Sequence, residues 1–189
     1  MREKWNQRYA EQDISKPSPA SVLADYSYLL PATGLALDLA CGLGGNAVYL
    51  ARQRLDVTAW DISDVAIARL NSTAKTEGLL LRTQVRDVEL QPPTPISFDV
   101  IVVSYFLSRS LFAPIAAALR PGGVLFYQTF GIEQPAGSSG SSNPQFRLQP
   151  NELIKVFSDL RVLVYRDEGL VGDSSQGLRN TVMLVAQKV

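Results

Sequence analysis

A strand-like run that contains an acid and leads into three glycines constrains the fold of this chain more than any other feature. Residues 35–46 read LALDLACGLGGN, so an apolar strand with Asp38 inside it turns through Gly42, Gly44 and Gly45 into a helix-like segment. Glycine permits a sharp turn and lets a ligand approach the backbone closely. The unpaired amide groups that begin a helix attract an anionic group. The sequence therefore predicts a strand, a turn and a helix that together bind a ligand.

A second acid, Asp61, ends the next strand-like run about 20 residues later, where a nucleotide ribose lies in folds of this kind. Its two carboxylate oxygens can accept hydrogen bonds from two ribose hydroxyls. An exposed strand-end acid is one alternative, and because Asp61 precedes Ser63, a helix-capping role is another. The placement of Asp38 and Asp61 around the glycines favours the ligand, and Ile62 beside Asp61 belongs to the same candidate site.

Two classes of nucleoside cofactor fit these features, because Gly42, Gly44 and Ala47 also match the dinucleotide pattern G-x-G-x-x-G/A. Asp38 favours S-adenosylmethionine, since dinucleotide binders normally have apolar residues there and an acid can meet the methionine amine. Asp87 and Val88 point the same way: the carboxylate can accept from an adenine amine while the backbone amide contacts the ring. We therefore expect S-adenosylmethionine rather than a nicotinamide dinucleotide.

Strand and helix patterns alternate from residue 35 onward, which predicts an α/β fold with a parallel, doubly wound, Rossmann-like sheet and helices on both faces. Two final strands without a helix between them predict an antiparallel hairpin. The expected strands are 35–40, 56–60, 80–86, 98–104, 124–130, 160–166 and 181–188, and the expected helices are one at the N-terminus and others at 22–30, 45–54, 64–77, 111–120 and 151–158.

The chain resembles the class I S-adenosylmethionine-dependent methyltransferases through LDLACGLGGN at 37–46. Within them it is similar to the tellurite-resistance and thiopurine methyltransferase-like branch, through Trp5, Arg8 and Tyr9 and through NPQFRLQPNEL at 143–153. The resemblance implies a seven-stranded sheet in the order 3-2-1-4-5-7-6 with the last strand antiparallel. The tellurite-resistance proteins have a His-Arg pair near the last two strands, whereas this chain has no histidine, and Arg179 is expected to stand in for a basic residue of that region.

Two segments are expected to cover the site. In the resembled branch the N-terminal segment covers the cofactor, which implies a helical cover over residues 1–30 in which Arg8 pairs with the methionine carboxylate and Tyr9 hydrogen-bonds nearby. Residues 131–150 are rich in Gly, Ser, Pro and Gln and follow the fifth strand, so they form either a lid or a plain surface loop. As a lid, they present Phe146 and the cation of Arg147 to an acceptor.

Methyl transfer mainly requires that nucleophile, methyl carbon and leaving sulfur be held in line, so a base is optional when the acceptor is a thiolate or selenide. Residues at the ends of the fourth and fifth strands are best placed for the acceptor, and packing is an equally good explanation for Tyr105, Phe106 and Tyr127. Cys41 has no base beside it and is interpreted as packing. The acceptor candidates are Tyr105, Gln128, Arg147 and Arg179, and the cofactor candidates are Trp5, Arg8, Tyr9, Asp38, Gly42, Gly44, Asn46, Asp61, Ile62, Asp87, Val88 and Ser104.

Composition limits the remaining possibilities. The 189 residues suit a single domain over 1–189, the formal net charge is zero, and a single cysteine favours a reducing, cytoplasmic compartment. Neither nucleic acid, nor a membrane, nor a metal is an expected partner, and the oligomeric state is left open. The function hypothesis is methyl transfer to a small acceptor, either a thiol, a selenium or tellurium compound, or a small organic molecule. A nonenzymatic module that binds S-adenosylmethionine or S-adenosylhomocysteine, or else an NAD-dependent oxidoreductase, is the alternative.

Overall fold

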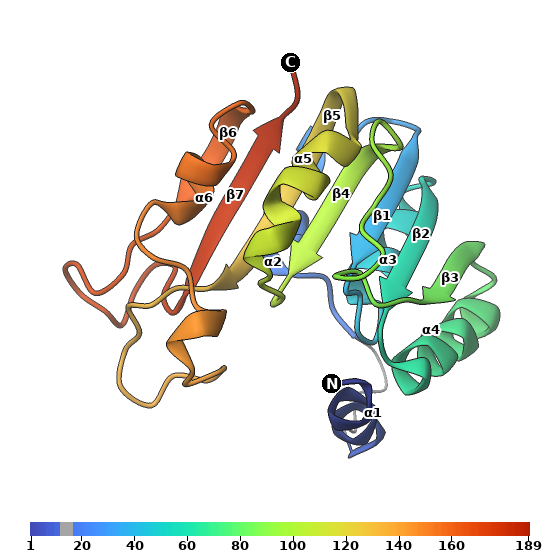
Figure 1. Ribbon diagram of the computed structural model, residues 1–189, viewed down its shortest axis with the longest axis horizontal. Coiled ribbons are helices and arrows are strands. Elements are labelled where there is room, and N and C mark those ends of the chain that lie inside the picture. Colours follow the sequence, from blue (N-terminus) through green and yellow to red (C-terminus); the bar gives the residue numbers. More distant parts are fainter. Residues whose placement is uncertain (12–16) are drawn as a thin grey trace.

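Residues 1–11 and 17–189 are described by the computed structural model, in which a seven-stranded sheet carries helices on both faces (Figure 1). The strand order is β3-β2-β1-β4-β5-β7-β6, as the sequence and its resemblance predict. The strands are β1 (Leu35–Leu39), β2 (Asp56–Asp61), β3 (Leu81–Val85), β4 (Phe98–Ser104), β5 (Leu119–Phe130), β6 (Arg161–Arg166) and β7 (Thr181–Gln187).

The five strands β1 to β5 are parallel, and β7 pairs antiparallel with both β5 and β6. The carboxyl ends of the parallel strands therefore meet at one edge, which is the lower edge in Figure 1. The N-terminal helix α1 and residues 131–150 lie at this same edge of the sheet (Figure 1). Ligands of open parallel sheets bind at this edge.

The two faces of the sheet are buried by different helices, because most strands alternate apolar side chains between the two sides. Helices α2, α3 and α4 pack on one face and α5 and α6 on the other. The helices are α1 (Arg2–Glu11), α2 (Ser21–Asp25), α3 (Gly45–Arg52), α4 (Asp64–Glu77), α5 (Phe112–Ala118) and α6 (Glu152–Val156), with 3₁₀ turns at η1 (Ser27–Leu29), η2 (Arg109–Leu111) and η3 (Pro144–Phe146).

Several predicted elements have different bounds in the structure, among them β5, which begins at Leu119 rather than at residue 124, and three helices. The single helix expected over 22–30 is divided into α2 and η1, because Tyr26 leaves the helical region with φ −114° and ψ 22°. The helix expected over 111–120 ends at Ala118, since Leu119 is extended and pairs with Phe98 at the start of β5. The helix expected over 151–158 is limited to α6. Part of the cover predicted over 1–30 falls on residues 12–16, outside the described residues.

Candidate functional site

The turn between β1 and α3 has no room for side chains at two of its glycines. Gly42 and Gly44 adopt left-handed conformations, with φ of 53° and 80°. A Cβ atom on Gly42 would lie 2.8 Å from the Tyr9 hydroxyl oxygen, and one on Gly44 would lie 2.3 Å from a methyl group of Leu70. The glycines are therefore required both by their backbone conformation and by close neighbours.

Asp38 supports this turn from inside the sheet. Its Oδ2 accepts a hydrogen bond from the Ala47 amide at 2.9 Å, and its Oδ1 accepts from the Asn46 side-chain amide at 3.3 Å. The N-cap position of α3 is Gly44, which has no side chain, so Asp38 provides the acceptor that a capping residue would supply. The carboxyl group is fully buried, and this burial raises its pKa to about 7. Its position beside the turn agrees with a cofactor role, but both oxygens already bind protein donors.

Asp61 holds the other side of the turn. Its Oδ2 accepts from the Gly42 amide and its Oδ1 from the Ser63 amide, both at 2.8 Å. The side chain is only 5% exposed, and burial raises its pKa above the ordinary value. Each oxygen keeps lone-pair capacity for a ligand hydroxyl. The sequence-based alternative of an exposed strand-end acid is wrong. The helix α4 is capped by Ser63, whose hydroxyl accepts from the Ala66 amide, and not by Asp61.

Asn46 joins three elements at the carboxyl edge. Its amide nitrogen donates to the Ser104 hydroxyl at 2.8 Å, and its carbonyl oxygen accepts from the Ala20 amide at 2.9 Å. The Asn46 side chain is 4% exposed. Asn46 therefore links α3 to the end of β4 and to the segment that precedes α2, while the partly buried Ser104 lies beside the turn.

A hollow of about 380 Å³ lies between the ends of β2 and β3 and the start of α1. Ile62, Arg86 and Asp87 contribute to its lining, and the Arg86 guanidinium lies 3.8 Å from the centre of the Trp60 ring. This volume lies within the range of small-ligand sites. Val88 is buried in the core, so only its backbone can contact a ligand. Our sequence analysis did not select Arg86, although its position directly after β3 is a usable signal.

The helix α1 carries the three N-terminal candidates across this edge. Trp5 and Tyr9 stack with ring centres 5.7 Å apart, and the exposed Arg8 guanidinium lies 5.2 Å from the Trp5 ring. Burial, with the nearby Asp61 charge adding to it, raises the pKa of the Tyr9 hydroxyl. No residue of α1 is fully buried, so polar contacts position it, chiefly those of Asn6, which sequence reasoning missed.

Asn6 fastens α1 to the first turn of α4. Its side-chain nitrogen donates to the Asp64 carboxylate at 2.6 Å, and its side-chain oxygen accepts from the Ser63 hydroxyl at 2.6 Å. Arg69 adds a bond from α4 to the Tyr9 carbonyl at 2.6 Å. The N-terminal helix is therefore placed over the glycine turn by hydrogen bonds to the same helix that Ser63 caps.

Two of the acceptor candidates meet at the ends of β4 and β5. Tyr105 has a left-handed backbone (φ 55°) and is 49% exposed, and its ring centre lies 5.3 Å from that of Phe130. Gln128 is buried; its nitrogen donates to the Tyr105 hydroxyl at 3.0 Å, and its oxygen accepts from the Val22 amide at 2.8 Å. Gln128 thus positions Tyr105, and Tyr105 is the side chain that faces the surface. Tyr127 is buried in the core, as its packing interpretation predicts.

The lid interpretation expected Arg147 to present its cation to an acceptor, but the guanidinium is not at the surface. The side chain is 1% exposed, and its guanidinium donates to main-chain carbonyl oxygens of the 131–150 segment and to the Asn180 side chain. Phe146, the other residue expected to close over an acceptor, is 48% exposed. A buried guanidinium with these partners organises its own loop.

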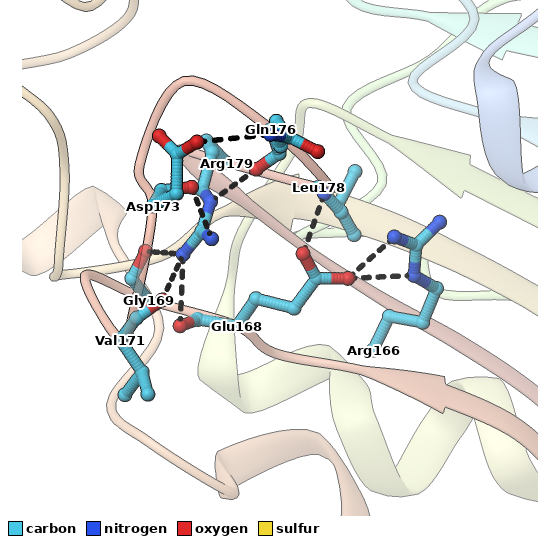
Figure 2. A network of polar contacts seen from close by, with 8 residues as sticks. All are labelled: Arg166, Glu168, Gly169, Val171, Asp173, Gln176, Leu178 and Arg179. Carbon is cyan, nitrogen blue, oxygen red and sulfur yellow. Dashed lines mark hydrogen bonds and ion pairs between the residues drawn. The ribbon is translucent and has the colours of Figure 1, made fainter.

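Arg179 is likewise committed to the loop between β6 and β7, as Figure 2 shows. Its guanidinium donates to five carbonyl oxygens of that loop, those of Glu168, Gly169, Val171, Asp173 and Gln176. The Glu168 carboxylate in turn binds the Arg166 guanidinium and the Leu178 amide (Figure 2). This arrangement gives Arg179 a structural role in the loop, and the structure does not bring it to the Tyr105 side chain.

Comparisons with known proteins agree with this geometry. A family model described as a methyltransferase domain matches residues 36–123. Over 142 residues the chain is 44% identical to the probable S-adenosyl-L-methionine-dependent methyltransferase TehB of Haemophilus influenzae. This alignment covers 69% of this chain and 47% of that protein. The chain belongs to the S-adenosylmethionine-dependent methyltransferases. The cofactor of this methyltransferase family is S-adenosyl-L-methionine, which excludes the nicotinamide alternative.

Solved structures place this methyltransferase in the same fold. The crystal structure of TehB from Haemophilus influenzae aligns with a TM-score of 0.72 and 25% identity, and the alignment covers 100% of this chain and 67% of the TehB chain. A structure described as showing the conversion of a disulfide bond into a thioacetal group during echinomycin biosynthesis aligns with a TM-score of 0.73 and 22% identity, covering 100% of this chain and 92% of that one. The chain spans about half the length of the TehB protein that it matches in sequence.

Two further findings concern the described ranges 1–11 and 17–189 only. Within them, no helix is long and apolar enough to cross a membrane. Among the same residues, no group of three or more metal-binding side chains gathers in one place.

Proposed function

We propose that this methyltransferase acts as one domain over residues 1–189, in the cytoplasm, and transfers the methyl group of S-adenosylmethionine to a small, soft nucleophile. A thiolate, selenide or telluride suits the site best, and a small organic molecule is the broader alternative. The observation that supports this most strongly is the half-exposed Tyr105 against the Phe130 ring at the carboxyl edge. The polar side chains beside this pair in the described residues, the Gln128 amide and the Arg147 guanidinium, cannot accept a proton.

The residues around the glycine turn fit the cofactor. We assign the ribose to Asp61, and the amino acid end to the region of Gly42, Gly44, Asn46 and Ser104. Asp38 holds the Ala47 amide and the Asn46 side chain beside this region. We assign the adenine ring to the hollow lined by Ile62, Arg86 and Asp87, beside Val88. Trp5, Arg8 and Tyr9 of α1 are assigned to the cover over the cofactor. Close approach at Gly42 and Gly44 supports this assignment, because a side chain at either position meets a neighbour.

The chemistry proposed for the acceptor follows from the lack of a general base beside Tyr105 among residues 1–11 and 17–189. The chain contains no histidine, and Asp38 and Asp61 are buried and hydrogen-bonded. Burial raises the pKa of the Tyr105 hydroxyl, so that this side chain stays protonated at neutral pH. A thiolate needs no base: its lone pair forms the new S–C bond while the methyl–sulfonium bond breaks, and the electron pair of that bond stays on the departing sulfur. Bound S-adenosylmethionine supplies the electrophilic methyl group, and the protein aligns the three atoms.

The test is the formation of S-adenosylhomocysteine with a panel of acceptors: two alkyl thiols of different acidity, sodium selenide, a phenol and a primary amine. We expect turnover with the thiols and selenide, and a pH–rate midpoint that moves with the pKa of each thiol, because the acceptor ionises in solution. A midpoint that is the same for both thiols, or faster turnover of the phenol or amine, contradicts the proposal. Binding of S-adenosylhomocysteine without any turnover favours the nonenzymatic alternative.

The TehB name of the relative gives a reason to include tellurium compounds in this panel. The matched relative is about twice as long as the alignment, so its activity is not transferred to this chain. A telluride should behave as selenide does, because both are soft anions that need no base. Tellurite itself must first be reduced, and we therefore test it only with an added thiol reductant.

A further inference from the structure

The segment 131–150 is tied into a fixed shape by the side chain that was expected to face an acceptor. The Arg147 guanidinium donates to the carbonyl oxygens of Gly131 and Ser141, each at 2.6 Å, and more weakly to that of Ser139 at 3.5 Å. It also donates to the Asn180 side-chain oxygen at 2.9 Å. One planar cation therefore fastens three points of the segment to one another and to the start of β7.

Asn180, in the neighbouring loop, binds the same segment. Its side-chain nitrogen donates to the Ser139 carbonyl at 2.8 Å, while its oxygen accepts from Arg147. A second tie joins the loops, since the Glu133 carboxylate accepts from the Leu170 amide at 3.0 Å. Residues 139–141 thus form an arch whose two outer carbonyls are held, and Gly140 lies between them.

Gly140 rests directly on the ring of Phe130. A Cβ atom at Gly140 would lie 2.7 Å from both Cε1 and Cζ of that ring, closer than real Cβ atoms approach carbon. The Arg147 guanidinium lies 5.3 Å from the centre of the same ring, and the Tyr105 ring centre is also 5.3 Å from it. Phe130 is therefore confined by the arch and by Arg147, and it lies against the half-exposed Tyr105.

We propose that Gly140 and Phe130 determine acceptor specificity by size: the arch fixes the Phe130 ring beside Tyr105, so the site admits compact soft nucleophiles such as small alkyl thiols and excludes aromatic thiols. This inference rests on the proposed function and names the substrate class more narrowly. Phe130 contributes one wall of the acceptor site, and Gly140 is the positioning residue that keeps that wall in place.

The first test compares kcat/KM for a small alkyl thiol and for a naphthalene thiol. Phe130→Leu removes the ring edge, so we expect the ratio of bulky to small acceptor to rise about 10-fold, the scale of discrimination that hydrophobic pockets achieve. The KM for S-adenosylmethionine should change less than about twofold, because the affected wall faces the acceptor. An unchanged ratio overturns the specificity role of Phe130.

The second test uses Gly140→Ala with Gly137→Ala as the matched control. Both glycines lie in the same segment with positive φ, 106° and 76°, so both substitutions introduce backbone strain. Only the Cβ at Gly140 meets Phe130, whereas that at Gly137 has nothing within 4 Å. We expect Gly140→Ala to raise the KM of the small thiol about fivefold, and the same change in a Phe130→Leu background to have less than about a twofold effect. Equal effects of the two alanines, or no dependence on Phe130, overturn the positioning role.

A readout without turnover separates this inference from the proposed function. Side-chain NMR spectra of the protein with S-adenosylhomocysteine should show shifted Phe130 and Tyr105 ring signals in Gly140→Ala and unshifted signals in Gly137→Ala. Moved rings without turnover of any acceptor would support the arch and contradict the proposed function. Turnover of thiols in the native protein with unmoved rings in Gly140→Ala would overturn the inference and leave the proposed function standing.

Discussion

At the level of single residues, the two acids beside the glycine turn accept hydrogen bonds from three backbone amides and one side-chain amide. Asp61 accepts from Gly42 and Ser63, and Asp38 accepts from Asn46 and Ala47. Burial makes these bonds matter, because a buried amide that loses its acceptor is costly. Substitutions of these acids therefore affect the fold of the turn and ligand affinity together.

Replacement of Asp61 by alanine should weaken both stability and ligand affinity. The amides of Gly42 and Ser63 lose their acceptor, so we expect the free energy of unfolding to fall by about 2–6 kcal/mol, from one to three per unpaired buried group. Affinity for S-adenosylhomocysteine should fall more than about 10-fold, since the turn loosens and a ribose contact is lost. Urea unfolding and calorimetric titration measure the two effects.

Asp56→Ala provides the control for this change. Asp56 is an exposed acid at the opposite end of β2, paired with Arg82 at the surface. Surface pairs of this kind contribute little, about 0–1 kcal/mol, and Asp56 is remote from the carboxyl edge. If Asp61→Ala resembles Asp56→Ala in both measurements, the role given to Asp61 is wrong.

The pH dependence of stability should reveal Asp38. Burial raises its pKa from the ordinary 3.8 to about 7 in the folded protein. Between these values the folded protein holds a proton that the unfolded chain has lost, so the free energy of unfolding decreases as pH rises from about 4 to 7. The slope from one group is at most about 1.4 kcal/mol per pH unit. Above about pH 7 its contribution becomes constant.

Asp38→Asn should remove most of this slope, measured by urea unfolding between pH 5 and 8. Burial also raises the pKa of Asp61, so the contribution of that group has the same sign as that of Asp38. The variant should be less stable than the native protein at pH 5, since an asparagine nitrogen faces the donating nitrogen of Asn46. An identical slope in native and variant proteins would contradict the assignment.

The role of a residue could be predicted from sequence where strand and helix patterns determine the position of its side chain. It could not be predicted where that position depends on the conformation of a loop. The positions of Asp38 and Asp61 at adjacent strand ends follow from strand spacing. The roles of Arg147 and Arg179 could not be predicted, because their partners are mainly carbonyl groups whose directions depend on the folded loops. For the same reason the role of Gly140 could not be predicted.

At the level of elements, the helix α1 is largely exposed, yet hydrogen bonds hold it over the glycine turn. None of its residues is fully buried, and Asn6 makes hydrogen bonds to both Asp64 and Ser63. Asn6→Ala should therefore lower affinity for S-adenosylhomocysteine about 5-fold or more while lowering the free energy of unfolding by about 1 kcal/mol. The bond to Asp64 is exposed and contributes little, whereas the buried Ser63 hydroxyl loses its acceptor.

Gln7→Ala is the matched control, since Gln7 is exposed on the same helix and its side chain bonds within α1, to Glu11. Calorimetric titration and urea unfolding of both variants separate helix placement from helix stability. Equal affinities for Asn6→Ala and Gln7→Ala would show that the docking of α1 does not contribute to binding.

Elements with clear end signals are the ones whose bounds were predicted best. The helix α4 matches its expected bounds, with Ser63 accepting from Ala66 at its start and Gly78 in the left-handed conformation at its end. The helix expected over 22–30 has no such signals in its interior, and the break at Tyr26 depends on packing. Local sequence therefore predicts the bounds of capped helices better than the bounds of helices whose breaks depend on packing against the sheet.

At the level of the whole molecule, the strand order followed from two features of the sequence and its resemblance. Alternating strands and helices require crossovers and thus a parallel sheet, and two final strands without a helix form a hairpin. That β7 inserts between β5 and β6 is not determined by pattern alone, and the family resemblance provided it. The hairpin leaves the carboxyl edge of β1, β2 and β4 open to a ligand (Figure 1).

Ligand binding at this edge should stabilise the entire fold, because the turn joins β1, β2 and α3. At 100 times its dissociation constant, S-adenosylhomocysteine should add about 2.7 kcal/mol to the free energy of unfolding. For a domain of this size that raises the melting temperature by about 5–10 °C. NAD⁺ at the same concentration serves as the control and should produce no shift, since the acid inside β1 and the family comparisons favour the methyl donor. A shift with NAD⁺ alone would contradict the cofactor assignment, and a shift with S-adenosylhomocysteine that persists undiminished in Asp61→Ala would move the binding site away from the glycine turn.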